Sequence, residues 1–405
     1  MKLFTLTSVA AALAMSSSVA AQTMAITNAT IHTATELGTL SNASVIIENG
    51  KITAINPDQV NADVIVDAQG KVLTPGFIGS RNQLGLVEVG AVAESRDGAD
   101  KKASITFDPS SAFNPRSSLI PYARKGGVTK DVITPSGSEG IFDGMAAVVS
   151  LSGEFDSVAQ KHVALAVDLG AKREGSRALS LAQLDDKLDA FKNKEKKDDD
   201  KAKPEDKILE GVFAKEIPLL ISVSRASDML ELLKLKAKYD VEMVFAGAQD
   251  AVLIADKLAA TGTPVIISAM DNLPGNFDSM HADLANAGKL EKAGVKVILT
   301  IAGDSAHNLY QLRFDAGNAV SYGMSPEGAL AAISSNVAEV FNINAGAIAV
   351  GNAADMALWS ADPFEISTKL EKVWIDGVEV STDSRHDKLR ERYTTESDMP
   401  RAYTK

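Results

Sequence analysis

Apolar and polar positions alternate near both ends of the chain. The strings "MAITNATIHTA" and "ASVIIENGKITAI", within residues 22–73, show the period of two that is typical of half-buried strands. The Asn-Gly pair of "ENGK" (residues 48–51) is a hairpin signal between two of them. Residues 343–380 repeat this style in "GNAADMALW" and "KLEKVWIDGVEV", where strands flank Gly- and Asn-containing turns. Two β-rich segments therefore bracket the chain.

Between them, residues 74–342 follow a different pattern. Short apolar runs alternate in many places with stretches of helical periodicity, for example 228–240, 251–262 and 282–294. Near-continuous apolar runs are typical of parallel strands buried on both faces. Eight such strands in repeated strand–helix units predict an α/β fold of the (β/α)8 TIM-barrel type, and a doubly wound open sheet is the alternative. The eight runs are 72–78, 128–134, 145–151, 163–167, 218–224, 241–246, 264–268 and 295–301.

Two polar segments interrupt or follow these units. Segment 192–207 mixes seven lysines with six acidic residues, so we expect a solvated, flexible loop or a frayed helix end before the fifth strand. Residues 381–405 are expected to form a polar C-terminal tail.

Residues 1–21 have the features of a cleavable signal peptide. Lys2 supplies a positive charge, an apolar run too short to span a bilayer follows, and small residues end at Ala21. We therefore expect export to the periplasm, with no membrane attachment after cleavage. The chain has no cysteine, which excludes disulfides and thiolate chemistry. Its formal net charge of −12 becomes −13 without Lys2, which argues against a nucleic-acid partner.

Several strings in order along the chain resemble the amidohydrolase superfamily, in particular its imidazolonepropionase- and prolidase-like metal-dependent hydrolases. They are "ENGKITAI", "GKVLTPGFI", "KGGVTKDVITPSG", "GNAADMALW" and "VWIDG". The resemblance implies that segments 22–73 and 343–380 combine into one β-sandwich beside a TIM barrel of residues 74–342. It also implies hydrolysis of non-peptide C–N bonds, in amides, lactams or acyl-amino acids, by a metal-activated water.

The resemblance also implies that most metal ligands of the family are substituted. The family motif Asp-x-His-x-His, which follows the Pro-Gly strand, falls on Gly79, Arg81 and Gln83. The aspartate that ends strand eight is kept as Asp304. A permanent cation at position 81 repels a divalent ion. A single divalent metal such as zinc, held through Asp304, and no metal at all both stay open. The other ligand positions fall on Ser222 or Ser224 after strand five, near Gly247 after strand six and, loosely, on Lys172 after strand four.

Two groups of residues are candidates for chemistry or binding. Asp304 and His307 follow strand eight, where an aspartate that orients a histidine makes a general base, although a surface histidine is the alternative. Arg81 and Arg225 predict a patch that binds a carboxylate, because the guanidinium fork matches a carboxylate. A salt bridge from Arg81 to Glu88 or Asp304 is the alternative to that patch. Further candidates for ligand contacts are Gln83, Ser222, Ser224 and Asn308.

Three functional hypotheses follow. The chain is an exported amidohydrolase that cleaves C–N bonds, a ligand-binding pseudoenzyme of that family, or an inactive partner subunit of an intact paralogue. In the first two cases the ligand is a small molecule, with a carboxylate as the group that the arginines would recognise. Self-association into a homo-oligomer is compatible with each of the three.

Overall fold

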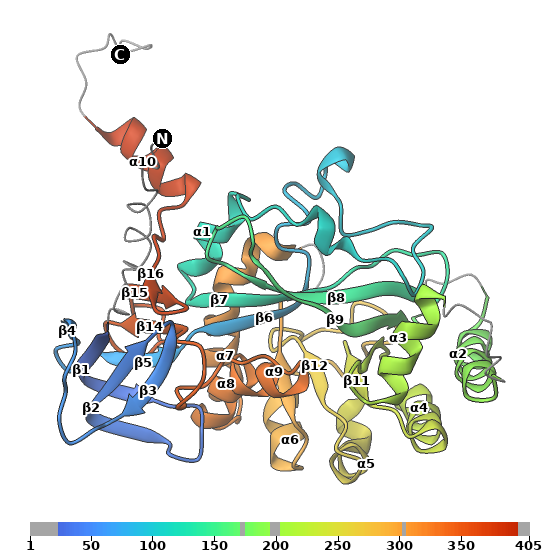
Figure 1. The fold of residues 1–405 in the computed structure, drawn as a ribbon. Helices are drawn as coiled ribbons and strands as arrows, with labels where there is room; N and C mark the ends of the chain where they lie inside the picture. The colour runs from blue at the N-terminus through green and yellow to red at the C-terminus, as the bar shows by residue number, and fades with distance from the viewer. Residues whose placement is uncertain (1–22, 171–174, 195–202, 302–304, 396–405) are drawn as a thin grey trace, which may run out of the picture.

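The computed structural model describes residues 23–170, 175–194, 203–301 and 305–395, which build two eight-stranded sheets with helices around the second (Figure 1). The predicted signal peptide lies outside the described residues. Within the described part of the chain, no helix has both the length and the apolar character needed to cross a membrane.

The first sheet combines strands from both ends of the chain. Its order is β16-β15-β14-β5-β1-β2-β3, and β4 pairs with β1. Ile47 and Ile52 from one end of this path share an apolar cluster with Met356 and Trp374 from the other, so the sheet encloses one core. The composite sandwich is thereby confirmed. The strands are β1 (Met24–His32), β2 (Thr39–Glu48), β3 (Lys51–Ile55), β4 (Val64–Asp67), β5 (Val72–Pro75), β14 (Met356–Trp359), β15 (Leu370–Ile375) and β16 (Val378–Glu379).

The chain passes from the sandwich to the barrel at the Pro75-Gly76 pair. β5 ends at Pro75 in the first sheet, and β6 begins at Phe77 in the second. A Cβ atom on Gly76 would lie only 2.2 Å from the hydroxyl oxygen of Thr129, which belongs to a neighbouring barrel strand. This close approach of the junction to that strand requires glycine. The apolar run 72–78 is therefore two strands of two domains and not one.

The second sheet is the predicted TIM barrel, in the order β13-β12-β11-β10-β9-β8-β7-β6. Its two edge strands are joined by a hydrogen bond from a side chain to the backbone: the Thr300 hydroxyl, just after β13, donates to the Ser80 carbonyl of β6. Helix α9 (Ser335–Val340) packs on both edge strands and adds Val337 to the apolar cluster inside the barrel. The strands are β6 (Phe77–Asn82), β7 (Val128–Ile133), β8 (Phe142–Ser150), β9 (Val158–Asp168), β10 (Leu219–Ser222), β11 (Met243–Ala246), β12 (Val265–Ile267) and β13 (Val297–Leu299).

One barrel strand runs against the others. β8 pairs antiparallel with both β7 and β9, whereas the other neighbouring strands of this sheet pair in parallel. The connections 134–141 and 151–157 contain no helix. Each is shorter than the dozen or so residues that a parallel crossover needs. The expectation of a regular strand–helix repeat is therefore wrong at β8, and the start of this strand lies at the barrel end where its neighbours finish.

The helices cover the outside of the barrel. Two of them, α3 and α10, lie partly or wholly in segments that the sequence predicts to be a loop and a tail. Helix α2 ends at Lys192 and α3 begins at Pro204, so the predicted loop 192–207 is partly helical, and 195–202 lie outside the described residues. Helix α10 (Arg385–Thr394) lies within the predicted tail and projects from the body (Figure 1). The other helices are α1 (Leu119–Arg124), α2 (Arg177–Lys192), α3 (Pro204–Phe213), α4 (Ala226–Tyr239), α5 (Ala255–Ala260), α6 (Asn286–Lys292), α7 (Leu312–Ser321) and α8 (Pro326–Ala332), with 3-10 turns η1 (Ala93–Ser95), η2 (Pro109–Ala112), η3 (Ala251–Ile254) and η4 (Ser305–Gln311).

Candidate functional site

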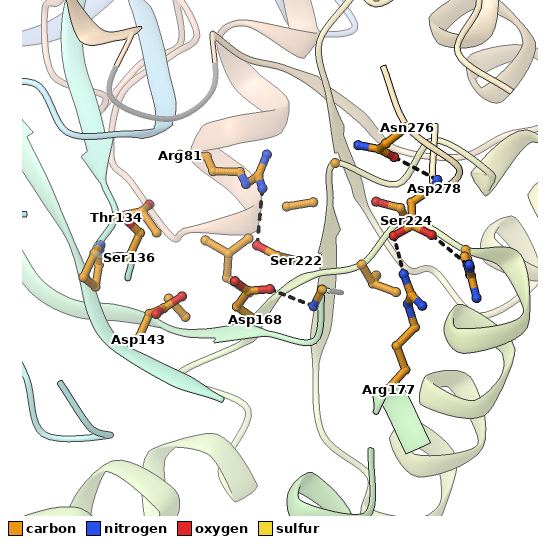
Figure 2. A pocket seen from close by; sticks show the side chains of 18 of the residues that line it. Arg81, Thr134, Ser136, Asp143, Asp168, Arg177, Ser222, Ser224, Asn276 and Asp278 are labelled. Carbon is orange, nitrogen blue, oxygen red and sulfur yellow. Dashed lines mark hydrogen bonds and ion pairs between the residues drawn. The ribbon is translucent and has the colours of Figure 1, made fainter. Parts of the chain in front are cut away.

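A cavity of about 830 Å³ opens at the barrel end where most of the strands finish (Figure 2). This size is ordinary for a small-molecule site. Residues at the ends of β6, β7, β9, β10 and β11 line it, together with the start of β8 and the loop after β12. Five predicted ligand contacts lie together on its wall: Arg81, Gln83, Ser222, Ser224 and Arg225.

Arg81 is placed in the cavity by a β-bulge. Ser80 pairs with Val132 and Asn82 pairs with Ile133, so Arg81 is an extra residue in the ladder between β6 and β7. Its backbone has φ of 55°, in the left-handed region that a long side chain rarely adopts. Bulges of this kind redirect a side chain, and they are frequent next to active sites.

The Arg81 guanidinium is half-buried, and its hydrogen-bond partner is neutral. It donates to the Ser222 hydroxyl at 3.3 Å, and a Cβ atom on Gly247 would lie 3.6 Å from both terminal nitrogens. Burial lowers the pKa of Arg81, whereas the carboxylates of Asp168, Asp271 and Asp143 oppose that shift. Arginine remains protonated in proteins, so the cavity holds a fixed positive charge.

No described carboxylate forms a salt bridge with this guanidinium. The predicted alternative partner Glu88 instead accepts hydrogen bonds from Asn114 at 2.9 Å and from Ser117 at 2.9 Å. The expectation of an Arg81–Glu88 salt bridge is therefore wrong, because Glu88 binds the loop that follows β6. The other alternative partner, Asp304, lies outside the described residues, as does Lys172.

Gln83 combines a place on the cavity wall with a structural role. Its amide nitrogen donates to the Gly98 carbonyl at 2.9 Å and to the Ser136 hydroxyl at 3.0 Å. These bonds attach the long segment after β6 to the end of β7. The amide donors of Gln83 are thereby used by the protein itself.

Three acidic residues of the cavity, Asp143, Asp168 and Asp278, were not among the predicted site residues. Asp168 ends β9 and accepts from the Gly170 backbone N–H at 2.8 Å, and Asp143 at the start of β8 accepts from that of Ser138 at 3.0 Å. Asp168 directly follows the apolar run 163–167, so its place at the end of a predicted barrel strand was a signal that could have found it. Asp143 could not be found in this way, since only an antiparallel β8 brings its first residues to this end.

Arg225 contacts a carboxylate, but an internal one. Its Nε donates to the Asp278 carboxylate at 2.8 Å, and Arg177 at the start of α2 binds the same carboxylate from another side (Figure 2). Asp278 lies in the loop after β12. The guanidinium that was predicted to contact a ligand is thus already paired with a carboxylate of the protein.

The predicted catalytic residues after β13 lie elsewhere. His307 is exposed on η4, Asn308 is half-buried there, and neither lines the cavity. The 3-10 turn instead directs Leu309 to the barrel, where a Cβ atom on Gly79 would lie 3.0 Å from its methyl groups. None of the five histidines lines the described part of this cavity. Within the described residues, no three His, Cys, Asp or Glu side chains converge as a metal site would require.

Comparison with known proteins agrees with this architecture. The profile of the amidohydrolase family matches residues 222–380. The crystal structure of an amidohydrolase from Thermotoga maritima MSB8 has a TM-score of 0.79 at 26% sequence identity, covering 88% of this chain and 99% of that one. Residues 222–380 thus match the amidohydrolase family, and the fold over most of the chain is that of an amidohydrolase. No curated protein sequence matches this chain.

More distant structures share the fold alone. A prolidase complexed with N-methylphosphonate-L-proline has a TM-score of 0.56 at 13% identity, covering 89% of this chain and 99% of that one. A β-aspartyl dipeptidase from Fervidobacterium islandicum AW-1, in complex with a β-Asp-Leu dipeptide, has a TM-score of 0.56 at 16% identity and covers 90% and 98%. The barrel and the sandwich are therefore common to this chain and to these hydrolases.

Proposed function

We propose that this amidohydrolase-superfamily protein binds a small carboxylate-bearing compound with an amide, lactam or acyl-amino-acid bond. In this proposal, metal-dependent hydrolysis of the family type is reduced or absent. The observation that carries it is the Arg81 guanidinium, half-buried in the cavity and hydrogen-bonded only to a neutral hydroxyl among the described residues. A carboxylate that accepts both terminal N–H groups of such a fork makes a strong, directional contact.

The donor set at the cavity fits an anion better than a divalent metal. Zinc prefers imidazole, thiolate and carboxylate ligands. The positions that match the family's histidines hold a guanidinium at Arg81, an amide at Gln83 and a hydroxyl at Ser222 or Ser224. The amide nitrogen of Gln83 is already bonded to Gly98 and Ser136. The charge of Arg81 opposes a dication and attracts a carboxylate.

A thermal-shift screen tests the binding. The mature protein is heated with N-acetyl amino acids, dipeptides and simple monocarboxylates, beside neutral amides of the same compounds. We expect the carboxylates to raise the melting temperature and their amides to have little effect. Arg81→Ala should lose the response, and the exposed Arg392→Ala on α10 should keep it. An unchanged response in Arg81→Ala contradicts the proposal.

Retained hydrolysis is the second candidate, and the superfamily assignment favours it. Asp143 and Asp168 place carboxylates in the same cavity, where such groups can act as general bases. Turnover of N-acyl amino acids or dipeptides by purified protein, lost in Asp168→Asn and kept in Arg392→Ala, would establish this function. Absence of turnover with carboxylate binding retained supports the pseudoenzyme.

The same proposal places the protein in the periplasm. Its support is the sequence of residues 1–21, with Lys2 before an apolar run and small residues before the cleavage site. Cell fractionation followed by N-terminal sequencing tests it. A mature chain that starts near Gln22 in the periplasmic fraction is the expected result, and an intact Met1 in the cytosol contradicts it.

A further inference from the structure

The loop after β12 carries an exposed group of apolar side chains. Between Ile267 and Asn286, four large apolar side chains are each about half or more exposed to solvent: Met270, Leu273, Phe277 and Met280. Phe277 is the most exposed, at 88%. Exposed apolar groups that cluster commonly mark a place where something binds.

Phe277 differs from the other three because it lines the cavity, together with its neighbours Asn276 and Asp278. Arg81, on the same cavity wall, is half-buried, whereas Phe277 is almost fully exposed. The cavity therefore has a charged inner part and an aromatic side chain at its rim.

The backbone next to Phe277 is held by contacts of the residue that follows it. Asp278 accepts from Arg225 at 2.8 Å and from Arg177, which belong to the N-terminal ends of α4 and α2. The Asp278 backbone N–H donates to the Asn276 side chain at 2.8 Å, which forms a local turn. Two arginines at the N-terminal ends of two helices thus bind this loop, and Figure 2 shows the contact between Arg177 and Asp278.

The pairing of Asp278 with two arginines also limits how many carboxylates of a ligand the cavity can bind. Arg177 and Arg225 are paired with Asp278, whereas Arg81 is the cavity arginine that forms no salt bridge with a described carboxylate. The matching ligand carries one carboxylate rather than two. A cavity of about 830 Å³ leaves room for a substantial apolar group beyond that carboxylate.

We propose that Phe277 determines ligand specificity, by covering an aromatic or large aliphatic group of a monocarboxylate whose carboxylate binds Arg81. Asp278 is the positioning residue that keeps Phe277 at the rim. This inference rests on the proposed function. It names the class of ligand as N-acyl amino acids with a bulky apolar acyl group, or compounds of that shape.

Calorimetric titration with two matched probes tests the inference. N-acetylglycine and N-benzoylglycine carry the same carboxylate and differ in the apolar group. We expect the mature protein to bind N-benzoylglycine ~10-fold more tightly, as burial of an aromatic ring against Phe277 predicts. Phe277→Ala should abolish this preference and leave the affinity for N-acetylglycine unchanged.

Two further variants distinguish the ligand contact made by Phe277 from the positioning role of Asp278. Asp278→Asn should reduce the preference for N-benzoylglycine without weakening N-acetylglycine, because the loop is released and Arg81 is untouched. Leu273→Ala is the matched control, since Leu273 is 80% exposed in the same loop but does not line the cavity. It should keep the wild-type preference. A preference that survives in Phe277→Ala overturns the inference.

The failure of the inference and that of the proposed function give different results. If Arg81→Gln weakens both probes equally while Phe277→Ala changes neither, the carboxylate site stands and the role of Phe277 is refuted. If the wild type binds neither probe, or if Arg81→Gln binds both as the wild type does, the proposed function fails and the inference fails with it.

Discussion

Two cationic side chains on neighbouring barrel strands differ in their partners, because one is paired with carboxylates and the other is bonded to a hydroxyl. On the side that faces the sandwich, Lys130 of β7 is 8% exposed and lies 2.8 Å from the fully buried Asp355 and 3.7 Å from Asp376. At the cavity, Arg81 of β6 has the Ser222 hydroxyl as its hydrogen-bond partner. Burial lowers the pKa of Lys130, but the two carboxylates outweigh it and leave this pKa raised.

The difference separates a structural charge from one that awaits a ligand. A buried charge is costly unless it is paired, and the sandwich supplies the partners of Lys130. Arg81 has no such described partner, and its backbone is also held in a strained conformation. Strain of this kind persists where the surrounding structure imposes it, often at a functional site. We therefore propose that Lys130 serves folding and that Arg81 serves binding.

The largest expected effect is on stability, at Lys130. Lys130→Met leaves Asp355 buried without its cation, so we expect the free energy of unfolding to fall by about 3–5 kcal/mol. Urea unfolding measures this change. The double variant Lys130→Met/Asp355→Asn removes both charges and should recover much of the loss. A loss in Lys130→Met no larger than that in Arg81→Met would remove the contrast between the two sites.

The buried carboxyl next to Lys130 gives a prediction about pH. Asp131 forms no salt bridge with a described residue and accepts a hydrogen bond from Asn82 at 2.7 Å, and burial raises its pKa from 3.8 to about 7. Between about pH 4 and pH 7 the folded state keeps a proton that the unfolded chain has lost, so stability should fall as the pH rises and then level off. Asp131→Asn should flatten this slope in thermal unfolding. An identical slope in both proteins contradicts the assignment.

A smaller effect tests the strain at the bulge. Arg81→Gly and Arg81→Ala both delete the guanidinium, but only glycine adopts a φ of 55° without penalty. We expect the glycine variant to be more stable by about 1 kcal/mol, with ligand binding lost in both. Chemical unfolding of the two variants side by side provides the measurement. Equal stability would mean that the bulge stores no strain.

Much of the fold follows from the apolar pattern. The eight runs of the barrel and the Asn-Gly hairpin are present where periodicity and turn chemistry indicate them. The turn is formed by Asn49 and Gly50, both with positive φ. Strand direction was not encoded in the same way, because a run such as 145–151 is equally apolar in either direction. The direction of β8 is indicated instead by the two connections beside it, which are too short for a parallel crossover.

The candidate site was predictable only where position along a strand decides it. Arg81, Ser222 and Ser224 reach the cavity because each lies at or just after the end of a barrel strand. His307 does not, since its orientation depends on how a 3-10 turn directs successive side chains. The pairing of Asp278 with Arg177 and Arg225 joins three distant segments, and no local pattern in the sequence indicates it.

The central claim is that the chain's own cation, Arg81, occupies a position that the family motif gives to a metal ligand. Elemental analysis of the mature protein, purified without chelators and again after incubation with zinc, manganese or iron, tests it most directly. We predict sub-stoichiometric metal in every preparation, together with carboxylate binding that depends on Arg81. Stoichiometric metal that stays bound through gel filtration would contradict the account.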